Sequence, residues 1–162
     1  MTPTHSGALQ VVRESLAFVR SAIEDLPQEA LEWKPLPTAN STTVLVAHAV
    51  SATRFFLRAG SGNVGSMAEY RSTERVAAFR ATGVAKADLL SILHAFEAEA
   101  ETILAEGTEA HLSSAVELPV TDGMPVPTRN GAGTLFAAVG HLREHVGHLQ
   151  VMHDLWLAEH PA

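Results

Sequence analysis

Cysteine is absent from this chain of 162 residues, and positive charge is scarce. Without cysteine there are neither disulfides nor thiolate metal ligands, so any thiol in its chemistry must come from a bound small molecule. Eleven Lys and Arg against eighteen Asp and Glu give a formal charge of −7, and the basic residues are scattered. Because nothing draws such a chain to phosphate backbones, we expect no nucleic-acid partner.

Long apolar runs are also missing. No stretch reaches the roughly 18 apolar residues of a membrane span, and the first residues show no charged segment followed by an apolar one. We therefore expect a cytoplasmic protein with no membrane partner. A composition of 46% apolar and 18% charged residues suits one globular domain over residues 1–162.

Apolar residues recur at three- and four-residue steps in four long segments, which predicts four amphipathic helices. The expected helices cover residues 6–26, 41–59, 85–106 and 131–158. We expect Asn40 or Ser41 to cap the start of the second helix and Gly107 to follow the end of the third. Four such helices around one core predict an all-α four-helix bundle.

Two connections between these helices differ from a plain turn. In the first, a glycine-rich turn leads to a polar stretch, residues 69–75, which predicts a short irregular helix. In the second, residues 107–131, apolar side chains alternate weakly at 116–120 and 124–128 around an Asp-Gly pair. Because prolines limit the ladder hydrogen bonds, we expect a short, poor β-hairpin or an ordered long loop before the last helix.

His141, His145 and His148 share about 60° of arc on the last predicted helix. This arc lies on the apolar side, so the three imidazoles are predicted to face the core. A buried imidazole without partners costs about 1 to 3 kcal/mol, and a divalent metal bound to neutral imidazoles removes that cost. His48 lies on the apolar face of the second predicted helix. It offers a fourth imidazole from a separate element, as a metal site requires.

Other histidines and acidic residues have simpler interpretations. His94 lies near apolar neighbours on the third predicted helix but has no histidine four residues away, so we interpret it as a core or boundary residue. The acidic residues of the same helix are expected to form a solvated face (Glu97, Glu99 and Glu101).

Two further kinds of metal site share part of this pattern. Residues 141–145 read H-x-x-E-H, the inverted zinc-peptidase signature, in which Glu144 would be catalytic. Those enzymes resemble much larger mixed α/β proteins. A ferritin-like di-iron centre needs Glu-x-x-His on two helices, and neither Glu97 nor Glu144 has a histidine three residues on. Neither alternative is favoured.

The order of these features resembles the DinB superfamily over nearly the whole chain. A connector with Trp and Pro precedes Asn40-Ser41, which opens the helix of His48, and a polar stretch then leads to the Leu89-Leu90 helix and a late H-x-x-x-H helix. The superfamily includes YfiT-like metal-dependent hydrolases and mycothiol-dependent maleylpyruvate isomerases. The resemblance implies an up-down-down-up bundle, a homodimer and one divalent metal with three protein ligands.

Carried over by position, the resemblance makes His48, His141 and His145 the metal ligands. A histidine at position 141 resembles the three-histidine members, because the isomerase branch usually has a glutamate there. His148 is weighed as a further ligand, or as a residue that orients a neighbouring imidazole or closes the site. Imidazole suits both Zn²⁺ and Ni²⁺, so either metal is expected. Glu144, on the flank of the helix, is a weak candidate for a general base.

Three protein ligands leave coordination positions open, and such a site on zinc activates water or a thiol. We therefore expect a metal-dependent enzyme that activates a low-molecular-weight thiol, as a transferase, or water, as a hydrolase, for attack on a small-molecule electrophile. The alternative is a non-catalytic metal-binding bundle with a structural, stress-response or sensing role. A third interpretation is that the histidines pack in the core without metal.

Overall fold

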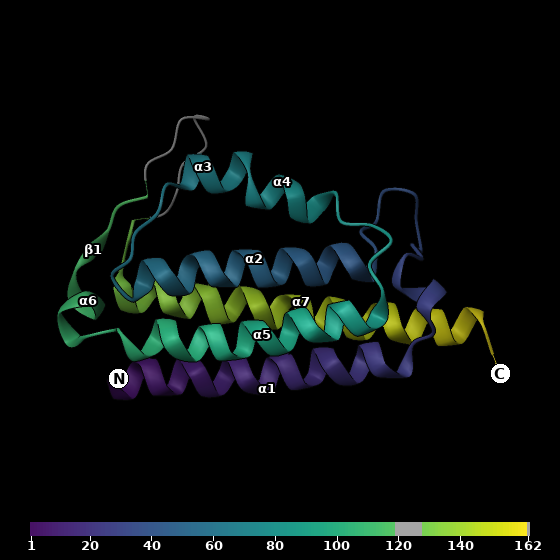
Figure 1. The fold of residues 1–162 in the computed structure, drawn as a ribbon, viewed down its shortest axis with the longest axis horizontal. Coiled ribbons are helices and arrows are strands. Elements are labelled where there is room, and N and C mark those ends of the chain that lie inside the picture. The colour runs from purple at the N-terminus through teal and green to yellow at the C-terminus, as the bar shows by residue number, and fades with distance from the viewer. Residues whose placement is uncertain (119–127, 162) are drawn as a thin grey trace.

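Four long helices run along the long axis of the molecule in the computed structural model, which describes residues 1–118 and 128–161 (Figure 1). They are α1 (Pro3–Asp25), α2 (Thr42–Gly60), α5 (Lys86–Ala105) and α7 (Gly131–Glu159). α1 and α7 run in one direction, and α2 and α5 run in the opposite direction (Figure 1). This arrangement confirms the predicted all-α bundle with up-down-down-up topology.

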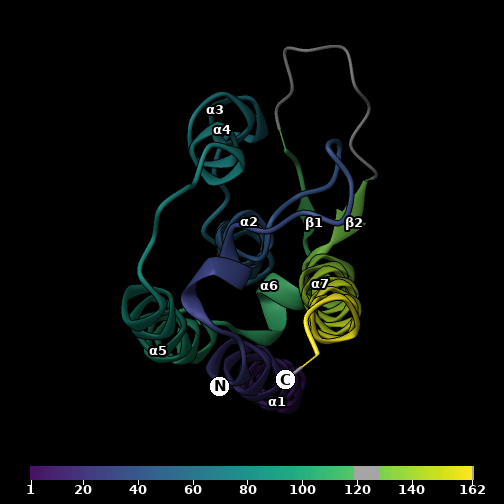
Figure 2. The same cartoon turned by 90° about the vertical axis from the view of Figure 1, so that its right-hand side faces the viewer.

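The four long helices stand at the corners of the bundle when it is viewed along its axis (Figure 2). α1 packs against α5 and α7, and α2 packs against the same two helices from the other side. Each helix turns its apolar stripe inward, and fully buried side chains from all four meet in one core (Leu16, Leu57, Phe96, Leu142). Within residues 1–118 and 128–161, no helix is both long and apolar enough to cross a bilayer.

Side-chain caps fix where the two helices of the histidines begin. The Ser41 hydroxyl accepts a hydrogen bond of 3.3 Å from the Val44 N–H, which identifies Ser41 rather than Asn40 as the cap of α2. The Asn130 side chain accepts one of 2.8 Å from the Gly133 N–H and caps α7. These caps set the start of each helix and therefore the direction in which its later residues point.

The first long connection folds into two short helices rather than one irregular helix over 69–75. They are α3 (Met67–Ser72) and α4 (Glu74–Phe79), preceded in the chain by a 3₁₀ turn η1 (Gln28–Leu31) in the proline-rich connector. α3 and α4 lie outside the bundle, next to α2 (Figures 1 and 2). The side chains of Met67 and Tyr70 are buried and pack against Ala52 and Phe55 of α2. The two short helices therefore cover the outer face of α2.

The second long connection holds a short helix and a minimal hairpin. These elements are α6 (Glu109–Ser113), β1 (Ala115–Val116) and β2 (Arg129–Asn130), with Ala115 opposite Asn130 in an antiparallel pair. The sequence predicted the two strands of the hairpin at 116–120 and 124–128. Among the described residues of these two ranges only Val116 pairs in the ladder, so the predicted strand bounds were wrong. Residues 119–127 lie outside the described residues.

Gly107 follows the end of α5, as predicted, but not because it needs a left-handed backbone. Positive φ angles occur, among the described residues, only at Gly62 and Gly83. A Cβ at Gly107 would instead overlap Nε2 of His5, which is fully buried in α1. Glycine at this position lets the chain pass directly over the His5 ring.

Candidate metal centre

Three imidazoles from two helices meet between α2 and α7. His48 projects from α2, and His141 and His145 project from successive turns of α7. The ring centroid of His48 lies 5.2 Å from that of His141 and 5.1 Å from that of His145, and the last two are 4.5 Å apart. One nitrogen of each ring lies within 4.8 Å of the others. The structure thus brings together the three residues that the resemblance implied.

The nitrogens of this cluster fit a divalent metal ion. Nε2 of His145 and Nε2 of His141 are 3.2 Å apart. Two nitrogens bound at 2.0 to 2.1 Å to one tetrahedral Zn²⁺ are about 3.3 Å apart. A hydrogen bond between the rings would give the same distance, but Nδ1 of His48 and Nδ1 of His145 are both buried and have no partner among the described residues. Buried polar atoms of this kind normally find a partner. A cation held by Nε2 of His145 would leave Nδ1 of the same ring unpaired, so of these two atoms only Nδ1 of His48 counts toward a bound ion.

Burial keeps the three imidazoles neutral, which is the form that binds metal. Desolvation, followed by the charges of His141 and Arg75, lowers the pKa of His48 to about 4. Desolvation, followed by the charges of neighbouring histidines, lowers the pKa of His145 to about 3. Burial also lowers the pKa of His141, against the opposing charge of Glu144. The nitrogen lone pairs are therefore available at neutral pH.

His148 and Glu144 lie outside the cluster. His148 is exposed, with its ring centroid 5.5 Å from that of His145, so the prediction that it faces the core was wrong. The side chain of Glu144 is 73% exposed, and its Oε2 lies 3.6 Å from Nδ1 of His141. Glu144 thus approaches a candidate ligand from the outer surface. Its role as a general base stays a hypothesis.

The residues of α5 that the sequence singled out lie outside the candidate cluster of His48, His141 and His145. His94 is exposed, so its interpretation as a core or boundary residue was wrong. Glu97 and Glu99 are half-buried and form ion pairs of 2.8 Å with Arg20 and 2.7 Å with Arg54. Instead of a free solvated face, these carboxylates tie α5 to α1 and α2.

A pocket of about 240 Å³ opens beside the cluster. Two candidate ligands and residues of α2, α3 and α4 line it: His48, Ala52, Phe56, Met67, Tyr70, Arg71, Arg75 and His141. The pocket exists because α3 and α4 fold back over α2. Sequence reasoning missed Tyr70, Arg71 and Arg75. The only signal for them was the polar character of the stretch that contains them.

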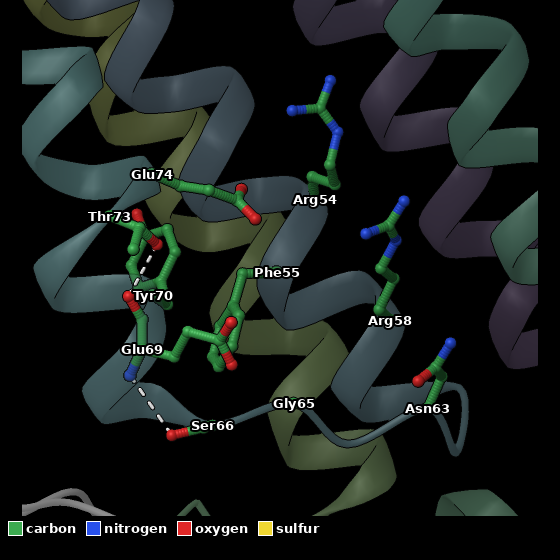
Figure 3. Close-up of a pocket in the computed structure, with 10 residues that line it drawn as sticks. All are labelled: Arg54, Phe55, Arg58, Asn63, Gly65, Ser66, Glu69, Tyr70, Thr73 and Glu74. Atoms are coloured by element: carbon green, nitrogen blue, oxygen red, sulfur yellow. Dashed lines mark hydrogen bonds between the residues drawn. The ribbon is translucent and has the colours of Figure 1, made fainter.

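Tyr70 separates this pocket from a second one of about 200 Å³, which Figure 3 shows. The Tyr70 ring stacks on Phe55 with centroids 4.7 Å apart, and its hydroxyl lies 3.5 Å from that of Ser51. Burial raises the pKa of Tyr70, so its hydroxyl stays protonated at neutral pH. The second pocket carries the acidic residues Glu69 and Glu74, and the pocket beside the histidines carries none of the described ones.

Comparison with known proteins gives both a family and a fold. The family described as mycothiol-S-transferase matches residues 4–155. No curated protein matches the chain significantly. Among solved structures, the DinB-like protein YjoA from Bacillus subtilis has a TM-score of 0.67 at 17% identity, over 93% of this chain and 92% of that one. The mycothiol-dependent maleylpyruvate isomerase has a TM-score of 0.64 at 15% identity, over 92% of this chain and 63% of that one. At these identities the structures share the fold.

Proposed function

Because this chain belongs to the mycothiol-S-transferase family of the DinB superfamily, we propose that it is a metal-dependent enzyme that transfers a low-molecular-weight thiol to a small electrophile. His48, His141 and His145 would hold one divalent ion, Zn²⁺ or Ni²⁺. When bound, such an ion lowers the pKa of a thiol at an open coordination position and so supplies thiolate at neutral pH. The observation that carries the proposal is a three-imidazole cluster that opens into a pocket of about 240 Å³.

The residues around the pocket suit a reaction between two bound molecules. The chain has no cysteine, so the nucleophilic sulphur comes from the small thiol. Its thiolate attacks an electrophilic carbon, a C–S bond forms, the leaving group departs with the bonding electron pair, and the thiol proton goes to solvent. Phe56 and Met67 provide an apolar wall against which the uncharged part of a reactant can lie.

A hydrolase would place water where the thiol binds. The described lining of the pocket contains no carboxylate that could serve as a general base. A bound Zn²⁺ would lower the pKa of water to about 7, but hydrolysis also needs a group that takes the second reactant's proton, whereas a thiol with a free pKa near 8.5 forms its anion with little help. The site therefore favours a thiol over water as the nucleophile.

A non-catalytic metal site is the other alternative. Structural zinc sites are usually closed by four protein ligands, and catalytic sites keep three with a position open. The cluster offers three histidines among the described residues, and a pocket adjoins it. Both features favour catalysis over a purely structural role.

The test compares metal content and thiol transfer in the same preparations. Protein purified without a histidine tag should contain about one metal ion per chain, with three protein ligands. It should also accelerate the transfer of mycothiol to 1-chloro-2,4-dinitrobenzene, with release of chloride. His48→Ala should lose both properties, whereas His94→Ala, on the exposed face of α5, should keep both. Thiol transfer by metal-free His48→Ala at the wild-type rate would overturn the proposal.

A further inference from the structure

The pocket beside the three histidines is basic in an otherwise acidic chain. The whole chain has a formal charge of −7. Of the eight residues that line the pocket, two are arginines and none is Asp or Glu. A concave surface lined by one sign of charge concentrates ligands of the opposite sign. The pocket is therefore suited to an anionic molecule.

Arg75 is the better placed of the two arginines. It lies on α4 and is exposed, and its guanidinium carbon is 4.7 Å from the centroid of the Phe79 ring. The Phe79 ring in turn lies 4.6 Å from the His48 ring. Stacking on an aromatic ring restricts a guanidinium while its N–H groups stay free to donate. Phe79 thus holds Arg75 beside a candidate metal ligand.

Arg75 is not occupied by an acidic neighbour. Arg13, Arg20, Arg54 and Arg58 all form ion pairs with glutamates of α5, but Arg75 pairs with no carboxylate within residues 1–118 and 128–161. Its sequence neighbour Glu74 lines the second pocket, and the Glu74 side chain extends toward α2 on the side of Arg54 (Figure 3). Glu69 and Glu74 therefore line the second pocket, whereas Glu144 approaches His141 from the outer surface and does not line the pocket of Arg75.

We propose that Arg75 binds a carboxylate of one of the two reacting molecules, so that the enzyme selects small anionic substrates. This inference rests on the proposed function and names the substrate class of the same pocket. A guanidinium can donate two parallel hydrogen bonds to a carboxylate, a geometry that a neutral amide cannot match. The apolar wall of Phe56 and Met67 would contact the uncharged part of the same molecule.

Calorimetric titration of the zinc-loaded protein tests the proposal in two arms. The first compares 3-mercaptopropionate with 3-mercaptopropanamide, and the second compares glutarate with glutaramide. If the carboxylate belongs to the thiol, the preference for acid over amide appears in the first arm. If the carboxylate belongs to the electrophile, the preference for acid over amide appears in the second arm. We expect a preference of roughly tenfold in at least one arm, weakening as salt is added because Arg75 is exposed.

Two charge-matched variants identify the residue responsible. Arg75→Gln should reduce the preference to about twofold or less, since the guanidinium contact is lost. Arg80→Gln removes an exposed arginine that follows α4 and lines neither pocket, and it should keep the wild-type preference. Both variants should retain the wild-type zinc content, because neither arginine is a candidate ligand.

The outcomes separate this inference from the proposed function. Equal binding of acid and amide in both arms, or a preference that survives in Arg75→Gln, would overturn the role of Arg75. If neither thiol binds but glutarate binds and is weakened by Arg75→Gln, the thiol reaction is refuted and the anion site is supported.

Discussion

One turn of α7 separates a candidate metal ligand from a histidine outside the cluster. His145 is buried with Nε2 directed at His141, whereas His148, three residues on, is exposed. His145→Ala should therefore lose its metal, and His148→Ala should keep about one ion per chain, because only the first removes one of three ligands. Elemental analysis of both variants measures this. Equal loss of metal from both would mean that the ligand set is wrong.

The sequence predicted the three-histidine site better than it predicted the surroundings of that site. Helical periodicity placed His48 and His145 on apolar faces, and the resemblance selected them. His148 was misplaced because it lies at the rim of the apolar arc, where the position of the neighbouring helix decides between core and solvent. Arg75 could not be predicted because its position depends on how α4 packs over α2, which no local pattern encodes.

Burial of His5 makes stability depend on pH. Desolvation, followed by the charge of the N-terminus, lowers the pKa of folded His5 below the ordinary histidine value of about 6.5. As pH falls through about 6.5, unfolded chains therefore take up a proton before folded ones, and the free energy of unfolding decreases until folded His5 is protonated too. His5→Gln should lose less stability than wild type between pH 7.5 and pH 5, measured by urea unfolding at each pH.

The control for this prediction is an exposed histidine. His94→Gln should show the wild-type dependence of stability on pH, because His94 is exposed on α5. Other buried histidines contribute to the wild-type slope, so the informative quantity is the difference between each variant and wild type. A His5→Gln protein with the full wild-type slope would show that His5 does not contribute.

At the scale of helices, two glycines should respond in opposite directions to the same added methyl group. Gly107→Ala should destabilise the fold by about 1 to 3 kcal/mol, because its Cβ would overlap the buried His5 ring. Gly7→Ala should stabilise it by about 0.5 to 1 kcal/mol, because Gly7 lies inside α1 with open space around it. Denaturant unfolding measures both changes. Destabilisation of similar size in both variants would contradict the steric explanation.

The four long helices were predicted to within about three residues at each end, the usual precision of a strong periodic pattern. The shorter elements were predicted less well. Residues 67–79 divide into α3 and α4 at Thr73, whose backbone is not helical. Met67 and Tyr70 pack α3 against α2, and α4 also packs against α2. Local patterns carry little information about elements that are stabilised in this way.

At the scale of the whole molecule, the candidate site depends on which helices are neighbours. Periodicity gives each helix an apolar face but does not say that α2 packs against α7. The resemblance implied that arrangement, and the structure confirms it. His48 and the two histidines of α7 are more than ninety positions apart in the chain, so the cluster exists only once the bundle has formed.

Metal binding should therefore stabilise the entire bundle, because the folded chain assembles the site and the unfolded chain does not. Free Zn²⁺ at about a hundred times its dissociation constant should raise the free energy of unfolding by about 2.7 kcal/mol. For a chain of this size, that corresponds to a melting temperature roughly 5 to 10 °C higher. Thermal unfolding with and without a chelator measures the shift. It should persist in His148→Ala and Arg75→Gln and vanish in His145→Ala. A chelator-insensitive wild-type protein, or an equal shift in His145→Ala, would mean that no ion joins α2 to α7 at these histidines.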